Sequence, residues 1–178
     1  MIARLNFHRH EAGLTLVELI VGIALAGLFS ALLAMLFVNG LTAQQQTTAR
    51  DSATGKVNLV SASIATSVRN STSIRITSAG ARLDLKVITP AGGEECRAWA
   101  LASGQVRYSA GASARSTDTS TWKPLAAGAT GTLTAGAAFQ LVGTDRVRVG
   151  LRISVSGQAV SVTDGVTAQA KGGGSLTC

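Results

Sequence analysis

The chain has 178 residues, a formal net charge of +7 and only 4% aromatic residues, a size and composition that allow one modest domain with a small aliphatic core. Both histidines, His8 and His10, lie near the start of the chain, so the rest of it lacks the usual base for nucleophile activation and the commonest metal ligand. The acidic residues are dispersed and form no calcium-binding loop. We therefore expect no enzyme, no cofactor and no metal site.

The N-terminal part of the chain contains one long apolar run. Residues 14–38 include a single charged side chain, that of Glu18, and the run is long enough to span a bilayer. Arg4 and Arg9 precede it and the next basic residue is Arg50, an asymmetry that predicts a cytoplasmic N-terminus. Because no small-x-small cleavage site follows the run, we expect a membrane anchor and not an ordinary removable signal.

Glu18 is the unusual residue of this run. A carboxylate in hydrocarbon is costly, so an acid there predicts a function with a specific partner. The simpler interpretation is a plain anchor whose glutamate lies about one helical turn into the run and reaches the membrane interface. Gly13 stands directly before the run, five residues before Glu18.

The segment Gly13-Leu14-Thr15-Leu16-Val17-Glu18, continued by apolar residues, resembles the class III signal of type IV pilins and type II secretion pseudopilins. The resemblance implies cleavage between Gly13 and Leu14 by a prepilin peptidase, followed by N-methylation of Leu14. The family usually has Phe at this position. The resemblance also implies that Glu18 serves assembly, because it would meet the new Leu14 amine of a neighbouring subunit and each buried charge would gain its partner.

The chain beyond residue 38 predicts a continuation of the helix. Its apolar residues recur every three or four positions, at Ala53, Val57, Val60, Ile64 and Val68. This stripe is typical of an amphipathic helix that packs on a sheet. Since the first proline is Pro90, we expect one helix over about residues 14–68, with residues 69–71 ending it.

The rest of the chain predicts antiparallel strands. Apolar and polar residues alternate around residues 74–77, 82–87 and 146–155, and residues 96–100 and 105–108 form a predicted hairpin across a turn at 102–104. Further strands are expected at 135–142 and 160–168, and a polar loop at 109–121. In residues 146–155 one face is aliphatic and the other basic, which predicts a half-exposed strand.

These elements predict an α+β fold of the pilin-like kind, a long N-terminal helix packed on an antiparallel β-sheet. The expected organisation is a leader at 1–13, a transmembrane or filament-core helix at 14–38, its amphipathic continuation at 39–70 and an exported head domain at 71–178. The order of a helix, a strand meander and a hairpin with cysteine and aromatic residues is most similar to W-type minor pilins and pseudopilin J.

Two cysteines, Cys96 and Cys178, are present. An even number in an exported domain favours a disulfide, which would close a loop of about 80 residues, over two free thiols.

Arginine supplies most of the positive charge and forms no run. The simpler interpretation is a solvated surface. The alternative is contact with a polyanion such as DNA through Arg146, Arg148 and Arg152, which share one strand face, with Arg107 joining them.

The resemblance implies a structural, minor subunit of a type IV pilus-like or type II secretion filament. Its partners would be other pilins or pseudopilins, prepilin peptidase and an inner-membrane assembly platform with its ATPase. The chain would cross the cytoplasmic membrane once with its head exported, and later enter a cell-surface or periplasmic filament. The alternative is a DNA-binding or adhesive minor pilin in DNA uptake or attachment.

Overall fold

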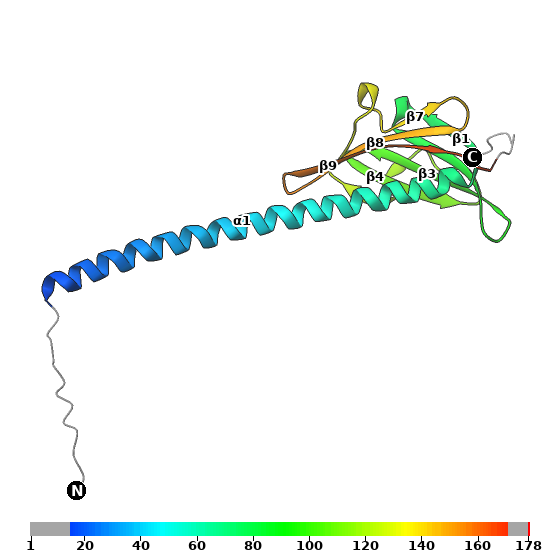
Figure 1. Ribbon diagram of the computed structural model, residues 1–178. Coiled ribbons are helices and arrows are strands. Elements are labelled where there is room, and N and C mark those ends of the chain that lie inside the picture. Colours follow the sequence, from blue (N-terminus) through cyan, green and yellow to red (C-terminus); the bar gives the residue numbers. More distant parts are fainter. Residues whose placement is uncertain (1–14, 171–177) are drawn as a thin grey trace, which may run out of the picture. The chain divides into compact units, whose positions relative to one another are not determined.

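The computed structural model of the chain describes residues 15–170 and residue 178. Among these residues the chain forms the helix α1 (Leu16–Arg69), followed by strands β1 to β9 (Figure 1). Two compact units are present, one that ends at Gln44 and one that runs from Gln45 to Cys178. The predicted α+β architecture, a long N-terminal helix with antiparallel sheets, is therefore confirmed.

The first unit contains the apolar part of α1. Its large apolar side chains from Leu16 to Val38 are between 50% and 74% exposed. This part of the helix is long and apolar enough to cross a membrane. A helix that is apolar on all sides and is not covered by its own chain requires lipid or other protein around it.

The second half of α1 packs on the sheets of its own unit. Its buried apolar side chains are those of the predicted stripe and one residue a turn earlier: Ala49, Ala53, Val57, Val60, Ile64 and Val68. The helix ends at Arg69, where the Ser71 hydroxyl donates to the Val68 carbonyl at 2.7 Å. The predicted end of the helix at residues 69–71 is thus confirmed, and the chain passes directly into β1.

The first sheet has five antiparallel strands in sequence order. They are β1 (Ser71–Thr77), β2 (Arg82–Ile88), β3 (Glu94–Ala102), β4 (Gln105–Gly111) and β5 (Lys123–Ala127). The turn between β1 and β2 includes the 3-10 turn η1 (Ser78–Gly80). Glycine is required at Gly80, because its φ is 84° and a side chain at this position would clash with Ala137. The predicted β3–β4 hairpin is confirmed.

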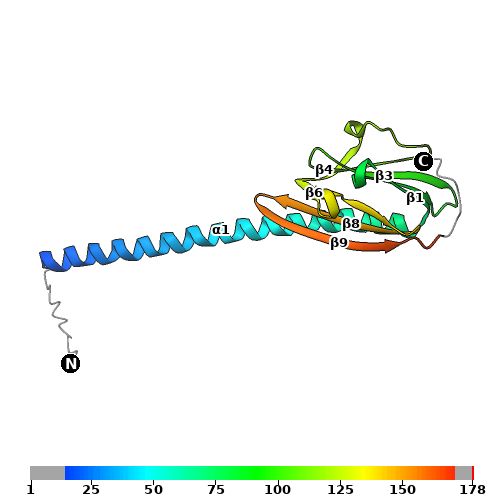
Figure 2. The same cartoon turned by 90° about the horizontal axis from the view of Figure 1, so that it is seen from above.

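The second sheet is built around β8 (Arg146–Val155). Strand β6 (Ala129–Gly131) pairs with residues 151–153 of β8, and β7 (Phe139–Val142) pairs with residues 146–149. Strand β9 (Gln158–Thr167) pairs with the full length of β8. Figure 2 shows β8 and β9 running beside the second half of α1.

Four short elements differ from the expectation. The strand predicted at 135–142 is confined to β7, because η3 (Thr134–Gly136) forms a turn with positive φ at Ala135 and Gly136. Strands β5 and β6 were not predicted, since five and three residues are too few for alternation to be recognised. The helical turn η2 (Thr119–Thr121) falls inside the predicted polar loop.

Both sheets and the helix share one core. Its largest fully buried side chains include Ile64 from α1, Trp99 and Leu83 from the first sheet, and Phe139 and Leu151 from the second. The Trp99 and Tyr108 rings lie 5.0 Å apart. The core is mainly aliphatic, as the low aromatic content predicts, and it includes the second half of α1.

Cys96 and Cys178 form a disulfide between β3 and the last residue of the sequence. Both are 5% exposed, and the Arg75 guanidinium donates to the Cys178 carbonyl at 2.7 Å. The disulfide favoured by the sequence is therefore present, and it closes a loop with a sequence separation of 82 residues. Such a loop restricts the unfolded chain strongly.

We predict that replacing both cysteines with serine lowers the free energy of unfolding by about 2–4 kcal/mol. Urea unfolding of the full chain in neutral detergent measures it through Trp99 and Trp122, which are both buried in the second unit. The reduced wild-type chain is the control and should match the double variant. Equal urea midpoints for the oxidised and the serine forms would contradict the prediction.

Candidate functional site

The start of α1 is held by a reciprocal pair of side chains, Thr15 and Glu18. The Thr15 hydroxyl accepts a hydrogen bond from the Glu18 backbone N–H at 3.2 Å. In return, Glu18 Oε2 accepts from the Thr15 backbone N–H and from the Thr15 hydroxyl, both at 2.9 Å. This is a capping box, which satisfies two backbone donors that a helix end leaves free.

The capping box leaves half of the Glu18 carboxylate free. All of its donors reach Oε2, and Oε1 accepts no hydrogen bond from the described part of the chain. Around Glu18 the helix presents exposed apolar side chains such as Leu16, Val17 and Leu19. The site can therefore bind one further donor or cation from another molecule without giving up the cap.

The capping role of Glu18 was not predicted from the sequence, although its signal is local. Thr15-Leu16-Val17-Glu18 is a threonine followed three residues later by a glutamate, directly before an apolar run. That pattern indicates a helix start with a capping box. The processing residues Gly13 and Leu14 lie outside the described residues, so their expected roles stay predictions.

Comparison with known families bears on this segment. Residues 8–34 match the prokaryotic N-terminal methylation motif. The match includes Gly13, Leu14 and Glu18, and it supports a protein of the type IV pilin or pseudopilin class, whose members are structural subunits and not enzymes. Together with the apolar half of α1, it also supports anchoring in a membrane. Neither a curated protein nor a solved structure matches the chain.

The four arginines proposed for polyanion contact do not lie together. Arg107 is on β4 of the first sheet, where its guanidinium donates to the Thr119 and Ser120 carbonyls at 3.0 and 2.7 Å. This arginine holds η2 in place. Arg146, Arg148 and Arg152 lie on β8 of the second sheet. Only these three share one face, so Arg107 is removed from the group.

The most connected polar cluster of the head is centred on Arg82. Its guanidinium makes three hydrogen bonds of 2.7 to 3.0 Å to the Asp84 carboxylate. It also donates to the Arg115 and Ser116 carbonyls and lies 4.9 Å from the Trp122 ring centroid. Asp84 is 1% exposed. The cluster therefore fastens the loop before η2 over the outer face of the first sheet.

A cavity of about 630 Å³ lies beside this cluster. Its lining includes Arg75, Arg82 and Arg115, a set that would suit an anionic ligand. Each of the three guanidinium groups already donates to groups of the chain itself. The cavity is thus a consequence of the loop packing and offers no free charge. No group of three or more metal-ligating side chains occurs among the described residues.

Among the described residues of the head, Asp118 and Tyr108 have displaced pKa values. The pKa of Asp118 is lowered because its carboxylate accepts hydrogen bonds from Ser120, first from the side chain and then from the backbone N–H, which lies 2.8 Å away and is capped by Asp118 at the start of η2. The pKa of Tyr108 is raised, first because its ring is partly buried. Neither lies near Glu18 in the chain, and both serve the packing of the first sheet.

Proposed function

We propose that the chain is a minor structural subunit of a type IV pilus-like or type II secretion-like filament, cut between Gly13 and Leu14 before assembly. The match of residues 8–34 to the methylation motif supports this most directly. Residues 1–13 are then the leader, 14–38 the membrane anchor and later filament core, 39–70 the amphipathic continuation and 71–178 the exported head.

The proposal gives the free oxygen of Glu18 a partner. Cleavage after Gly13 creates a positive amine at Leu14, and Glu18 Oε1 is the acceptor that the capping box leaves open. In a helical array the amine of one subunit meets the carboxylate of the next. Pairing two charges that would otherwise lie alone in an apolar environment fixes the axial register of the subunits.

The apolar half of α1 suits both stages of this process. Before assembly its exposed side chains face lipid, and afterwards they face the same helices of other subunits. The apolar surface stays out of water in each state, so extraction from the membrane does not carry the cost of exposing it. Extraction requires an assembly platform in the inner membrane with a cytoplasmic ATPase.

The proposed orientation has the N-terminus in the cytoplasm and the head exported. The basic residues before the apolar run favour it, and the disulfide is consistent with an oxidising compartment. The partners are prepilin peptidase and other pilins or pseudopilins. We place the chain nearest to W-type minor pilins and pseudopilin J, from the helix, the meander and the β3–β4 hairpin with Cys96 and Trp99.

The processing step is tested by intact-mass spectrometry of the chain from membranes and from sheared filaments of its native host. We predict that the filament form begins at Leu14 and carries one methyl group. Replacing Gly13 with Leu should leave a full-length chain in the membrane, since the proposed cut follows this glycine. An unprocessed wild-type chain, or one cut elsewhere, would contradict the proposal.

A further inference from the structure

Three arginines of the head have no bonding partner in the described part of the chain. Arg146, Arg148 and Arg152 are exposed, and none of them takes part in a hydrogen bond or ion pair there. The other arginines of the strands and loops differ. Arg75, Arg82, Arg97, Arg107 and Arg115 all donate to acidic side chains or carbonyls. Among the arginines of the described strands and loops, those without a bonding partner therefore all lie on the second sheet.

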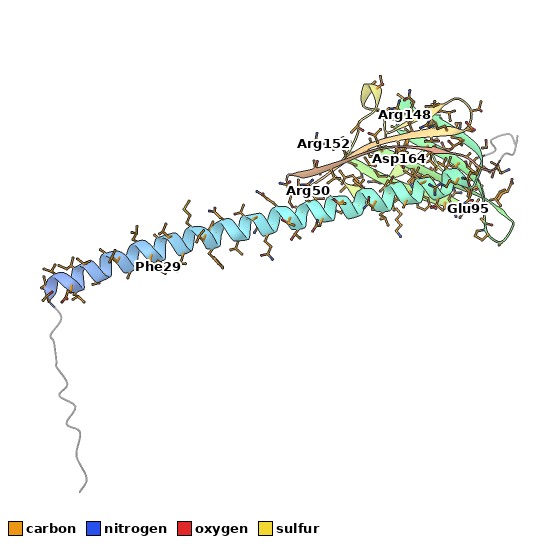
Figure 3. The ribbon with its side chains drawn as sticks, viewed as in Figure 1. Phe29, Arg50, Glu95, Arg148, Arg152 and Asp164 are labelled. Atoms are coloured by element: carbon orange, nitrogen blue, oxygen red, sulfur yellow. A yellow bond between two sulfur atoms is a disulfide. The ribbon has the colours of Figure 1, made fainter. Side chains whose placement is uncertain are left out.

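The three free guanidinium groups project from one face of that sheet. They occupy alternate positions of β8, whose opposite face carries the buried Val147, Val149 and Leu151. Figure 3 shows Arg148 and Arg152 on the side of β8 turned away from α1, and Asp164 on the side toward it. Asp164 therefore does not neutralise this face.

The cross-strand partners of Arg148 and Arg152 are uncharged. Across β8 the partners of Arg148 are Gln140 and Gly165, and those of Arg152 are Thr130 and Ser161. Arg146 lies against the β9 backbone, since a side-chain carbon at Gly165 would come within 2.7 Å of its guanidinium. No aromatic side chain lies among these partners.

A small loop stands between Arg148 and Arg152. A side-chain carbon at Gly150 would lie 2.6 Å from Leu133, so the loop that leads into η3 covers the middle of the strand. The η3 turn is exposed and contains only Thr134, Ala135 and Gly136. Arg148 and Arg152 are four residues apart on β8, which corresponds to about 13 Å along a strand. This spacing is close to the roughly 12 Å width of the DNA major groove.

We propose that this face of the second sheet binds the phosphate backbone of double-stranded DNA without regard to sequence. Arg148 and Arg152 contact phosphates on the two sides of a groove, and the uncharged η3 turn lies at the groove between them. Arg146 contacts the next phosphate along β8. Single strands are recognised mainly through stacking on aromatic side chains, which this face lacks, so the duplex is the form that fits.

Three phosphate contacts predict a definite salt dependence. Each neutralised phosphate releases counterions, so the three arginines should contribute about 2.7 to the slope of log affinity against log salt concentration. A single subunit binds weakly with so few contacts, and repetition along a filament raises the effective affinity. The site itself does not depend on filament assembly, so the two proposals can fail separately.

The test measures binding of a short fluorescein-labelled DNA duplex to the full chain in neutral detergent micelles, by anisotropy between about 50 and 200 mM salt. One variant combines Arg146→Gln, Arg148→Gln and Arg152→Gln. Its matched control combines Lys56→Gln, Arg69→Gln and Lys123→Gln, which removes the same charge from α1 and β5. We expect the first variant to bind roughly tenfold more weakly at low salt and to lose about 2.7 of the slope.

The control variant should keep most of the affinity and the slope. Equal losses in the two triple variants would overturn the proposal, because net charge alone would then explain binding. Tighter binding of a single strand than of the duplex would also overturn it. So would binding to vesicles of anionic phospholipid without binding to duplex DNA. Thr134→Glu should weaken duplex binding, and unchanged binding would exclude the η3 turn from the groove.

Discussion

Replacing Glu18 with Gln should remove the chain from filaments while leaving leader cleavage and membrane insertion intact. Glutamine can still accept both hydrogen bonds from Thr15, so the capping box is kept. The substitution removes only the negative charge, and the neighbour's Leu14 amine is then left without a counter-ion in an apolar surrounding. We expect roughly a tenfold or greater fall in the filament-bound fraction, measured by quantitative immunoblotting of sheared filaments.

Thr15→Val is the matched control for this prediction. It removes the hydroxyl that bonds to the Glu18 backbone N–H and to Oε2, and it keeps the charge. The first turn of the helix should become less stable while filament incorporation is retained. If Thr15→Val abolishes incorporation and Glu18→Gln does not, the capping box is what assembly needs and the intermolecular ion pair is wrong.

Replacing Arg82 with Met should destabilise the head more than any other single change to a charged residue. It leaves the Asp84 carboxylate, 1% exposed, without its three hydrogen bonds. Removing one partner of a buried ion pair costs about 3–5 kcal/mol. The loop before η2 and Trp122 also lose their contacts with the guanidinium. Urea unfolding monitored by tryptophan fluorescence measures the effect.

Two further variants make the Arg82 prediction specific. Glu94→Gln breaks the ion pair with Lys86, in which the glutamate side chain is 56% exposed, and should cost less than about 1 kcal/mol. Adding Asp84→Asn to Arg82→Met removes the unpaired negative charge of the buried Asp84 carboxylate and should recover part of the lost stability. An Arg82→Met variant no less stable than Glu94→Gln would contradict the account of the cluster.

The elements with strong periodicity could be predicted from the sequence. The stripe from Ala53 to Val68 specified the packed half of α1, and the alternation in residues 146–155 specified both faces of β8. In these segments burial and secondary-structure period agree, so local pattern is sufficient. The apolar run of α1 was equally clear, because a run of this length without other charges has few alternatives.

The contacts between distant segments could not be predicted. Arg82 and Asp84 stand in the polar positions of a strand, and the pattern does not show that the loop before η2 and Trp122 cover that face. Periodicity likewise does not assign strands to sheets, so Arg107 was grouped with the arginines of β8. The capping role of Glu18 is different, since its signal is local and was present in Thr15 and Glu18.

The most direct test of the central claim is a zero-length cross-link between a carboxylate and an amine, formed with a carbodiimide in intact filaments. Trypsin does not cut between Leu14 and Arg50, because no basic residue lies between them. Lys86 and Glu94, whose charged atoms are 2.6 Å apart, provide an internal control in the same sample.

We predict a cross-linked species in which Glu18 of this chain is joined to the N-terminal amine of a second subunit's first peptide. It should occur in filaments and be absent from chains dispersed in detergent. If the Lys86–Glu94 cross-link forms in filaments and no intermolecular link to Glu18 is found, the ion pair created by leader cleavage does not hold the subunits together.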